Sequence, residues 1–265
     1  MTDLTGKFFW YELMTSDPDG AIRFYGDVLG WTTKPFGDDL QGDAYHVISA
    51  SAGQMGGIMA IPAELKDHGM RPWWGGYIGS ADVDADAKRL TDAGGSVKRA
   101  PEDIPGVGRF AVMSDPGGAI FMLLKGFSPE GMEAAPPMAN GHVGWHELYS
   151  GDFDKDLAFY TSQFGWGKGQ AMDMGEMGSY QLFSMSGATE FNEMSGGMMA
   201  RPKEVPVPLW LFYFVVPDID EAVERVKAGG GAVLNGPEEV PGGAWIIQGS
   251  DPQGAMFALV GMRNG

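Results

Sequence analysis

The chain of 265 residues contains no cysteine. This absence excludes disulfide bonds, thiolate metal sites and cysteine nucleophiles. Basic residues are scarce as well, because 18 Lys and Arg stand against 35 Asp and Glu, which gives a formal net charge of −17. A surface this acidic repels a phosphate backbone, so we expect no nucleic-acid partner.

Long apolar runs are also missing from the sequence. No segment approaches the ~20 apolar residues that a membrane-spanning helix needs, so we expect no membrane partner. The first residues, MTDLTGKFFWYELM, lack the extended apolar stretch of a signal peptide. We therefore expect a cytoplasmic protein. Hydrophobic residues make up 44% of the chain, which is enough for a packed core.

What the chain does have is an internal repeat. WYELMTSDPDGAIRFYGDVLGW at 10–31 corresponds to WHELYSGDFDKDLAFYTSQFGW at 145–166, and a second pair of similar segments lies at 100–124 and 236–260. Repeats of this kind indicate duplicated structural units. We predict two domains, 1–126 and 142–265, joined by a proline-containing linker at 127–141.

Each copy divides again into two modules. Their approximate ranges are 7–62 and 72–125 in the first copy, and 142–200 and 208–262 in the second. Alternating and helical patterns follow one another in the order strand, helix, strand, strand, strand in every module. The predicted fold is α+β, with four βαβββ modules arranged as two paired-module domains with cupped mixed sheets. One helix covers only one face of such a sheet, so two facing sheets would enclose a cup for a ligand.

The first helix of each copy has clear end signals. Asp17 is a good N-cap, Pro18 suits the first helical position, and Gly30 ends the helix. Residues at helical spacing predict the buried stripe, which is Ile22, Tyr25 and Leu29 in the first copy and Leu157, Tyr160 and Phe164 in the second.

These motifs resemble the vicinal oxygen chelate superfamily, which includes glyoxalase I, bleomycin-resistance proteins and extradiol dioxygenases. The resemblance rests on paired βαβββ modules, the helix pattern D…FY…LGW, and a DPxG turn before the last strand, in SDPGGAIFML at 114–123 and SDPQGAMFAL at 250–259. It spans almost the whole chain except the linker, in a four-module tandem form. Because two-module members commonly dimerise, it implies a fused dimer, and we expect a monomer or a weak homodimer.

The resemblance also implies a divalent metal held by His, Gln or Glu on the first and last strands of a module. None of the residues at those positions here suits such an ion, and thioether is a poor ligand for it. We therefore expect no metal and no cofactor. The positions are occupied by Trp10, Gly75, Met122, Trp145, Leu211 and Ala258.

Two glutamates are the candidate catalytic residues. Strand alternation places Glu12 and Glu147 on the face opposite Leu13 and Leu148, toward the cup. Each carboxylate is a candidate general base or a hydrogen-bond acceptor for a ligand. The alternative is a structural carboxylate bonded to the backbone or to an arginine.

Other side chains are predicted to line the cups. Tyr77 and Tyr213 lie at equivalent positions and would either orient a ligand or be partly buried with their hydroxyls satisfied. Arg109 and Trp245 are also equivalent; the arginine would bind a carboxylate or pair with Glu12, the tryptophan would stack on an apolar ligand, and the alternative is an exposed strand end. The full predicted ligand-binding set is Trp10, Glu12, Tyr77, Arg109, Met122, Trp145, Glu147, Tyr149, Tyr213 and Trp245.

Three features have weaker functional readings. His46 and its counterpart Gln181 are expected to be surface or satisfied residues, and no helix holds His142 and His146 together as a metal pair. The Gly pairs in GQMGGIM and EMSGGMM indicate a bulge or a close approach by a neighbouring sheet. Methionines between 172 and 199 would line an adaptable pocket or fill irregular core, and they are Met172, Met174, Met177, Met185, Met194, Met198 and Met199.

The sequence therefore predicts a metal-independent protein that binds a small, partly apolar or aromatic molecule in one or both cups. Two other functions stay open. One is a glyoxalase-like lyase or isomerase, or a dioxygenase, and the other is a structural or interaction module without a ligand. Glu12 and Glu147 would carry a metal-free acid–base reaction in the first of these.

Overall fold

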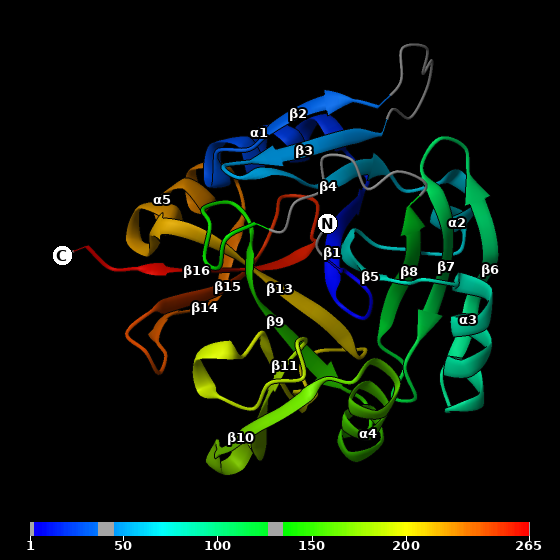
Figure 1. Ribbon diagram of the computed structural model, residues 1–265. Coiled ribbons are helices and arrows are strands. Elements are labelled where there is room, and N and C mark those ends of the chain that lie inside the picture. The colour runs from blue at the N-terminus through cyan, green and yellow to red at the C-terminus, as the bar shows by residue number, and fades with distance from the viewer. Residues whose placement is uncertain (1–2, 37–44, 127–134, 265) are drawn as a thin grey trace. The chain divides into compact units, whose positions relative to one another are not determined.

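The computed structural model describes residues 3–36, 45–126 and 135–264. The first half of the chain follows the predicted order twice, as Figure 1 traces from blue to green. The first module contains β1 (Phe8–Thr15), α1 (Pro18–Leu29), β2 (Thr32–Pro35), β3 (His46–Ala50) and β4 (Gly53–Ala60). The second module follows a short helix α2 (Ala63–Asp67) and contains β5 (Trp73–Gly79), α3 (Val83–Asp92), β6 (Ser96–Ile104), β7 (Gly108–Ser114) and β8 (Ile120–Gly126).

The second half repeats this order, from green to red in Figure 1. The third module contains β9 (Val143–Ser150), α4 (Phe153–Phe164), β10 (Gly167–Asp173), the 3₁₀ turn η1 (Gly175–Met177), β11 (Ser179–Ser184), the 3₁₀ turn η2 (Phe191–Glu193) and β12 (Gly196–Ala200). The fourth contains β13 (Leu209–Asp218), α5 (Ile219–Ala228), β14 (Ala232–Glu239), β15 (Trp245–Ser250) and β16 (Met256–Met262). Among the described residues, no helix is long and apolar enough to cross a membrane.

The strands form two eight-stranded mixed sheets. Their orders are β2-β3-β4-β1-β5-β8-β7-β6 and β10-β11-β12-β9-β13-β16-β15-β14. Within a module the first strand pairs in parallel with the last one, as β1 with β4 and β9 with β12, and the other pairs are antiparallel. This arrangement confirms the predicted α+β fold built from βαβββ modules.

Packing divides the chain into two compact units. Unit 1 consists of Met1–Phe9, Gly75–Glu133 and His146–Trp210, and unit 2 consists of Trp10–Trp74, Ala134–Trp145 and Leu211–Gly265. Unit 1 therefore contains mainly the second and third modules, and unit 2 mainly the first and fourth. Part of the predicted linker at 127–141 lies outside the described residues, which resume at 135.

The helix ends match their sequence signals. In α1 the Asp17 carboxylate accepts a hydrogen bond from the Gly20 N–H at 3.0 Å, and Gly30 takes the left-handed conformation at φ 72°. The predicted stripe is correct at Tyr25 but wrong at its other two positions, since Ile22 and Leu29 are only half-buried. The buried face has the spacing i, i+3, i+4, i+7 and consists of Ala21, Phe24, Tyr25 and Val28.

A buried hydrogen-bond chain explains both the FY motif and the DPxG turn. In unit 2 the Trp74 indole N–H donates to the Tyr25 hydroxyl at 2.9 Å, and that hydroxyl donates to the Asp251 carboxylate at 3.1 Å. Asp251 also accepts from the backbone N–H of Ala255 and so closes the DPQG turn. These hydrogen bonds thus join a helix of the first module to a turn of the fourth.

Unit 1 contains the equivalent chain. The Trp210 indole N–H donates to the Tyr160 hydroxyl at 3.1 Å, and Tyr160 donates to Asp115 at 3.1 Å. Burial and the neighbouring carboxylate raise the pKa of Tyr160 well above its usual value, so the phenol keeps the proton that it donates. The ring of Tyr160 also stacks on Trp166 with 4.7 Å between centroids. The hydrogen bonds of Tyr160 to Asp115 and Trp210 are therefore polar contacts inside an aromatic core.

Candidate functional site

The two faces of the third module's sheet can be told apart by one hydrogen bond. Ser150 of β9 donates to Asp156 of α4 at 2.5 Å, so Ser150 lies on the helix-covered face. Because strand residues alternate, Leu148 shares that face, whereas Glu147 and Tyr149 lie on the other. The predicted orientation of Glu147 is therefore confirmed. Glu147 and Tyr149 are both buried, at 6% and 4% exposure.

Glu147 is bound by a tyrosine from β11, which β12 separates from β9 in the sheet. The Tyr180 hydroxyl, at the start of β11, donates to Glu147 Oε2 at 2.8 Å. Gly197 of β12 stands directly opposite Glu147 in the parallel register. A Cβ atom on Gly197 would lie 2.1 Å from Cε1 of Tyr180, so only glycine leaves room for the ring.

Unit 2 contains the same arrangement. Tyr45 hydrogen-bonds to Glu12 and accepts a bond from the Trp10 indole N–H at 2.8 Å. Gly57 stands opposite Glu12 in β4, and a Cβ there would lie 2.1 Å from Cζ of Tyr45. Burial, and then the charge of Glu12, raise the pKa of Tyr45 well above its usual value. The phenol therefore stays protonated and acts as the donor to the carboxylate.

Sequence reasoning did not identify Tyr45 and Tyr180. Their signal was the glycine pair in GQMGGIM and EMSGGMM, which indicated a close approach to the strand. The second glycine of each pair, Gly57 or Gly197, is approached by a tyrosine ring of the same module rather than by a neighbouring sheet. The glycine, the tyrosine and the opposing glutamate form one unit, which we call the Glu–Tyr pair.

A second row of side chains shares a face in the fourth module. Tyr213 and Gln248 both stand opposite Ala258, and the Gln248 side-chain amide donates to the Tyr213 hydroxyl at 2.8 Å. The second module has Tyr77 and Val112 opposite Met122 at the equivalent places. Tyr77, Met122 and Tyr213 are all buried, and the two tyrosines are buried more completely than the alternative interpretation expected.

Arg109 does not lie on the face predicted for it. Its guanidinium pairs with Asp84 of helix α3 at 2.5 Å and with Asp103 at 3.0 Å, so the side chain reaches toward the helix-covered side. Val112, an odd number of residues further along β7, stands opposite Met122 and points to the other side. The predicted pairing with Glu12 is wrong, because acids of the second module occupy the guanidinium.

Trp245 is corrected in the same way. The Arg263 guanidinium lies 3.8 Å from the centroid of the Trp245 ring and pairs with Asp220 of helix α5 at 2.6 Å. Gln248, three residues on, faces the opposite side with Tyr213. Both positions therefore lie beside an ion pair with a helix aspartate. Arg109 makes that ion pair itself, whereas Trp245 packs against Arg263, which makes it.

His146 and His142 make contacts within the protein that point to a structural role. His146 stacks on Phe8 with 5.3 Å between centroids, and its Nδ1 contacts the Ser195 carbonyl at 3.0 Å. Burial lowers the pKa of His146 to about 4, so the ring is neutral at pH 7. The His142 ring accepts a bond from the Ala52 N–H, and burial lowers its pKa too. His46 is half-buried in β3.

The positions implied for a divalent metal do not offer donors. Trp10 and Trp145 are half-buried indoles, and the other four positions hold the buried Gly75, Met122, Leu211 and Ala258. In residues 3–36, 45–126 and 135–264, no three His, Asp or Glu side chains are grouped closely enough to hold a metal ion. Indole and aliphatic groups do not ligate divalent metals, so these residues do not fit the implied metal.

Comparison with known sequences places the chain beside a large family. The family model for the Glyoxalase/Bleomycin resistance protein/Dioxygenase superfamily matches residues 7–123 and 141–259. CFP32 of Mycobacterium tuberculosis, provisionally named a glyoxylase, is 29% identical, and the match covers 95% of this chain and 93% of that protein. The anthracycline biosynthesis protein DnrV of Streptomyces peucetius is 30% identical, with 97% and 93% covered.

Solved structures show the same fold. The Mn(II)-bound glyoxalase of Novosphingobium aromaticivorans superimposes with a TM-score of 0.66 at 16% identity, covering 98% of this chain and 83% of the other. The 2,3-dioxygenase LapB of Pseudomonas sp. KL28 also gives 0.66, at 15% identity and with 98% and 93% covered. At these identities the likeness extends to the fold alone.

Proposed function

The chain belongs to the Glyoxalase/Bleomycin resistance protein/Dioxygenase superfamily, and from that premise we propose that it binds a small, partly aromatic molecule without using a divalent metal. The observation that carries this proposal is the Glu–Tyr pair on the helix-free face of each half. A buried carboxylate is costly unless hydrogen bonds compensate it, and a protein that duplicates this feature retains a polar group where packing alone would favour an apolar one.

The Glu–Tyr pair indicates what kind of ligand group would be recognised. In unit 2 the Tyr45 hydroxyl gives its only proton to Glu12 and accepts one from Trp10. The carboxylate is an acceptor, so the complementary ligand group is a donor such as a phenol, an alcohol or an amine. The Trp10 indole, which donates to Tyr45, favours a flat, apolar surface on the rest of the ligand.

The proposed ligand class is a hydroxylated polycyclic aromatic molecule. DnrV, whose name refers to anthracycline biosynthesis, is similar to this chain over nearly its whole length. Anthracyclines are fused-ring quinones with phenolic hydroxyls, which combine the flat surface and the donor groups expected above. A dihydroxyanthraquinone is therefore a suitable probe.

The test is a calorimetric titration of the full chain with dihydroxyanthraquinone. Glu12→Gln and Glu147→Gln each replace the charged acceptor by a neutral amide of similar size. We expect one of them to weaken binding by roughly tenfold or more, since a hydrogen bond to a charged group contributes ~1.5–3 kcal/mol. Arg109→Ala, on the helix-covered side, is the control and should bind like the parent. Undiminished binding by both glutamate variants, or no binding by the parent chain, would contradict the proposal.

Metal independence has its own test. The purified chain should contain less than one transition metal per molecule by elemental analysis, and a chelator should change neither its melting temperature nor probe affinity. A stoichiometric metal whose removal lowers both would replace this proposal with a metalloenzyme.

A metal-free acid–base enzyme is the second candidate. The observation in its favour is a glutamate held beside a protonated phenol, and the provisional glyoxylase name of CFP32 agrees with it. Incubation with a panel of α-ketoaldehyde–thiol adducts, followed by mass and NMR analysis, would reveal isomerisation. Glu12→Gln or Glu147→Gln should then abolish turnover while leaving substrate binding in place. Full turnover by both variants would exclude the glutamates.

A further inference from the structure

The methionines between 172 and 199 do not share one environment. Met198 and Met199 of β12 are buried at 1% and 7% exposure, so the core interpretation holds for them. At the tip of the β10–β11 hairpin, Met174 and Met177 are 39% and 56% exposed. Core packing does not explain why two large apolar side chains are exposed together at one hairpin tip.

The hairpin backbone places these side chains close together in the chain. Asp173 of β10 pairs with Ser179 of β11, and the Met174 N–H donates to the Gly178 carbonyl at 2.8 Å. Between them runs the 3₁₀ turn η1, in which the Met177 N–H points back to the Met174 carbonyl at 3.3 Å. Side chains three residues apart in a 3₁₀ turn lie on the same side.

A third thioether adjoins this pair. Met172 lies near the end of β10, and Met174, just beyond the strand, continues the hairpin ladder through its N–H bond to Gly178, so the two positions share one face of the hairpin. Met172 is half-buried and pairs across the hairpin with Tyr180. Three flexible thioether side chains therefore start from neighbouring positions of one hairpin.

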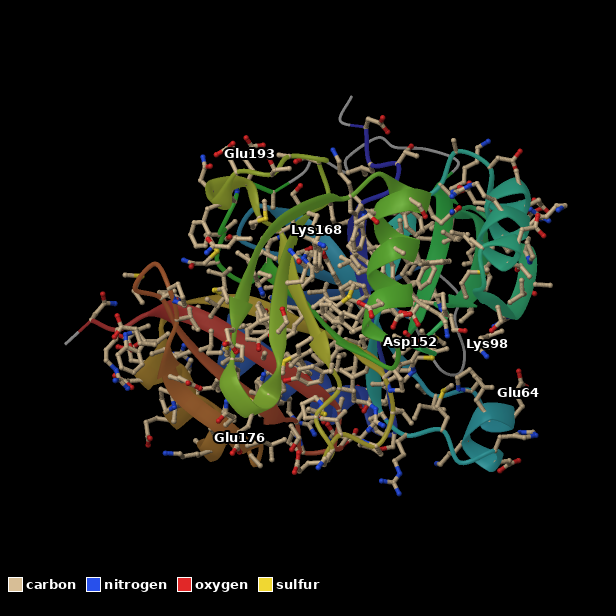
Figure 2. All side chains as sticks on the ribbon, turned by 90° about the horizontal axis from the view of Figure 1, so that it is seen from below. Glu64, Lys98, Asp152, Lys168, Glu176 and Glu193 are labelled. Carbon is tan, nitrogen blue, oxygen red and sulfur yellow. The ribbon has the colours of Figure 1, made fainter. Side chains whose placement is uncertain are left out.

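The charges around the hairpin favour a cation. Asp173 and Glu176 alternate with the methionines, and Figure 2 labels Glu176 at the end of the hairpin. The sequence has no lysine or arginine between Lys168 and Arg201, so no basic side chain of this segment competes for the site. Asp173 is held in place, because its carboxylate accepts a bond from the Gly175 N–H at 2.9 Å.

We propose that the β10–β11 hairpin binds one soft monovalent cation, Cu(I) or Ag(I), through the thioethers of Met172, Met174 and Met177. Soft sulfur ligands select Cu(I) over hard divalent ions, and a thioether needs no deprotonation before it binds. The adjacent carboxylates supply negative charge without being required as ligands. Met172 stands opposite Tyr180, so the site adjoins one Glu–Tyr pair. Its test uses silver as the probe and does not depend on the small-molecule ligand.

Ag(I) is the probe, since it is the redox-inert equivalent of Cu(I). The full chain carrying ¹³C-methyl methionine is titrated with silver nitrate in chloride-free buffer containing excess sodium nitrate, which displaces ions held only by carboxylates. Native mass spectrometry gives the stoichiometry, and methyl NMR identifies the ligands. We expect one silver per chain, with three methyl resonances shifting together.

Leucine variants assign those resonances and test the site. Met→Leu conserves volume, so replacing all three exposed or half-exposed methionines should leave the fold intact by circular dichroism. The triple variant should lose the silver adduct, whereas Met262→Leu, an equally exposed methionine at 53% on another strand, should retain it. Glu176→Gln should retain it as well. An adduct that survives in the triple variant, or no adduct in the parent chain, would overturn the proposal.

Discussion

The two compact units contain the same Trp–Tyr–Asp chain but differ in the charge beside it. In unit 1, Asp156 of α4 accepts from the Gly117 N–H at 2.7 Å, so a second carboxylate binds the DPGG turn closed by Asp115. Unit 2 has Ala21 at the equivalent place in α1, and Asp251 closes its turn with backbone and Tyr25 hydrogen bonds. The Trp–Tyr–Asp hydrogen bonds that join helix and turn are present in both units, whereas the side chains around them differ.

This difference changes the ionisation of unit 1. Burial, and then the charge of Asp156, raise the pKa of Asp115 to about 7. Burial also raises the pKa of Asp251, with no neighbouring carboxylate among the causes. The helix-free faces diverge too, since Tyr213 has Gln248 as a partner where the second module has Val112 beside Tyr77.

The largest expected effect tests the shared part of the comparison. Phe121 packs on Tyr160 in unit 1 at 6.0 Å between centroids, and Phe257 packs on Tyr25 in unit 2 at 5.7 Å. Both rings are fully buried, so Phe121→Ala and Phe257→Ala should each cost about 3–5 kcal/mol of unfolding free energy in urea. A cost under about 1 kcal/mol in one unit only would show that the two cores are not equivalent.

The second prediction concerns pH. Folded Asp115 keeps its proton up to about pH 7, whereas an unfolded aspartate loses it near pH 3.8. Between these values the folded state binds more protons, so the unfolding free energy falls as pH rises, by at most roughly 1.4 kcal/mol per pH unit. Asp156→Asn removes the neighbouring charge and should flatten this slope in urea titrations from pH 4.5 to 8. A variant slope as steep as that of the parent would rule out Asp156 as its source.

The third prediction concerns the Tyr213 row. Gln248→Val removes the amide that donates to Tyr213 and copies the second module's Val112. We expect a loss of about 0.5–1.5 kcal/mol in unfolding free energy, the net worth of one hydrogen bond. The reverse change, Val112→Gln, is the control in the other unit. It should introduce an amide beside Tyr77 without the same loss of unfolding free energy. Equal losses from both changes would indicate a volume effect.

The smallest effects should come from the surface ion pairs. Arg109→Ala and Arg263→Ala each break a partly exposed pair with a helix aspartate. Each should lower the urea midpoint only slightly, and the effect should shrink in 1 M salt because exposed charges are screened. A large loss of stability that persists in salt would mean that one of these arginines supports more than its ion pair.

The order of helices and strands was predictable because its signals are local. Asp17, Pro18 and Gly30 mark the ends of α1 without reference to any other segment, and the repeat offers the same reading twice. The orientation of Glu147 was predictable too, since alternation from Leu148 along one strand is sufficient.

Other features depend on contacts between distant segments. The face of Arg109 was predicted wrongly because a one-residue error along a strand reverses every side chain, and β6 beside it carries two irregularities in register. Tyr45 and Tyr180 were missed because each reaches its glutamate across a strand that separates them. Which modules share a compact unit depends on helix–turn contacts such as Tyr25 with Asp251, 226 residues apart.

The contact of Tyr45 with Gly57, and of Tyr180 with Gly197, limits where the two copies can differ in length. Gly57 follows Tyr45 by twelve positions, and Gly197 follows Tyr180 by seventeen, yet both rings lie against their glycine in the same way. The extra residues are in the connection that contains η2, outside the strands. Because lengthening a loop adds little closure entropy, insertions there should be well tolerated. A tyrosine followed at variable distance by a glycine pair is therefore a better search pattern for this site than any fixed spacing.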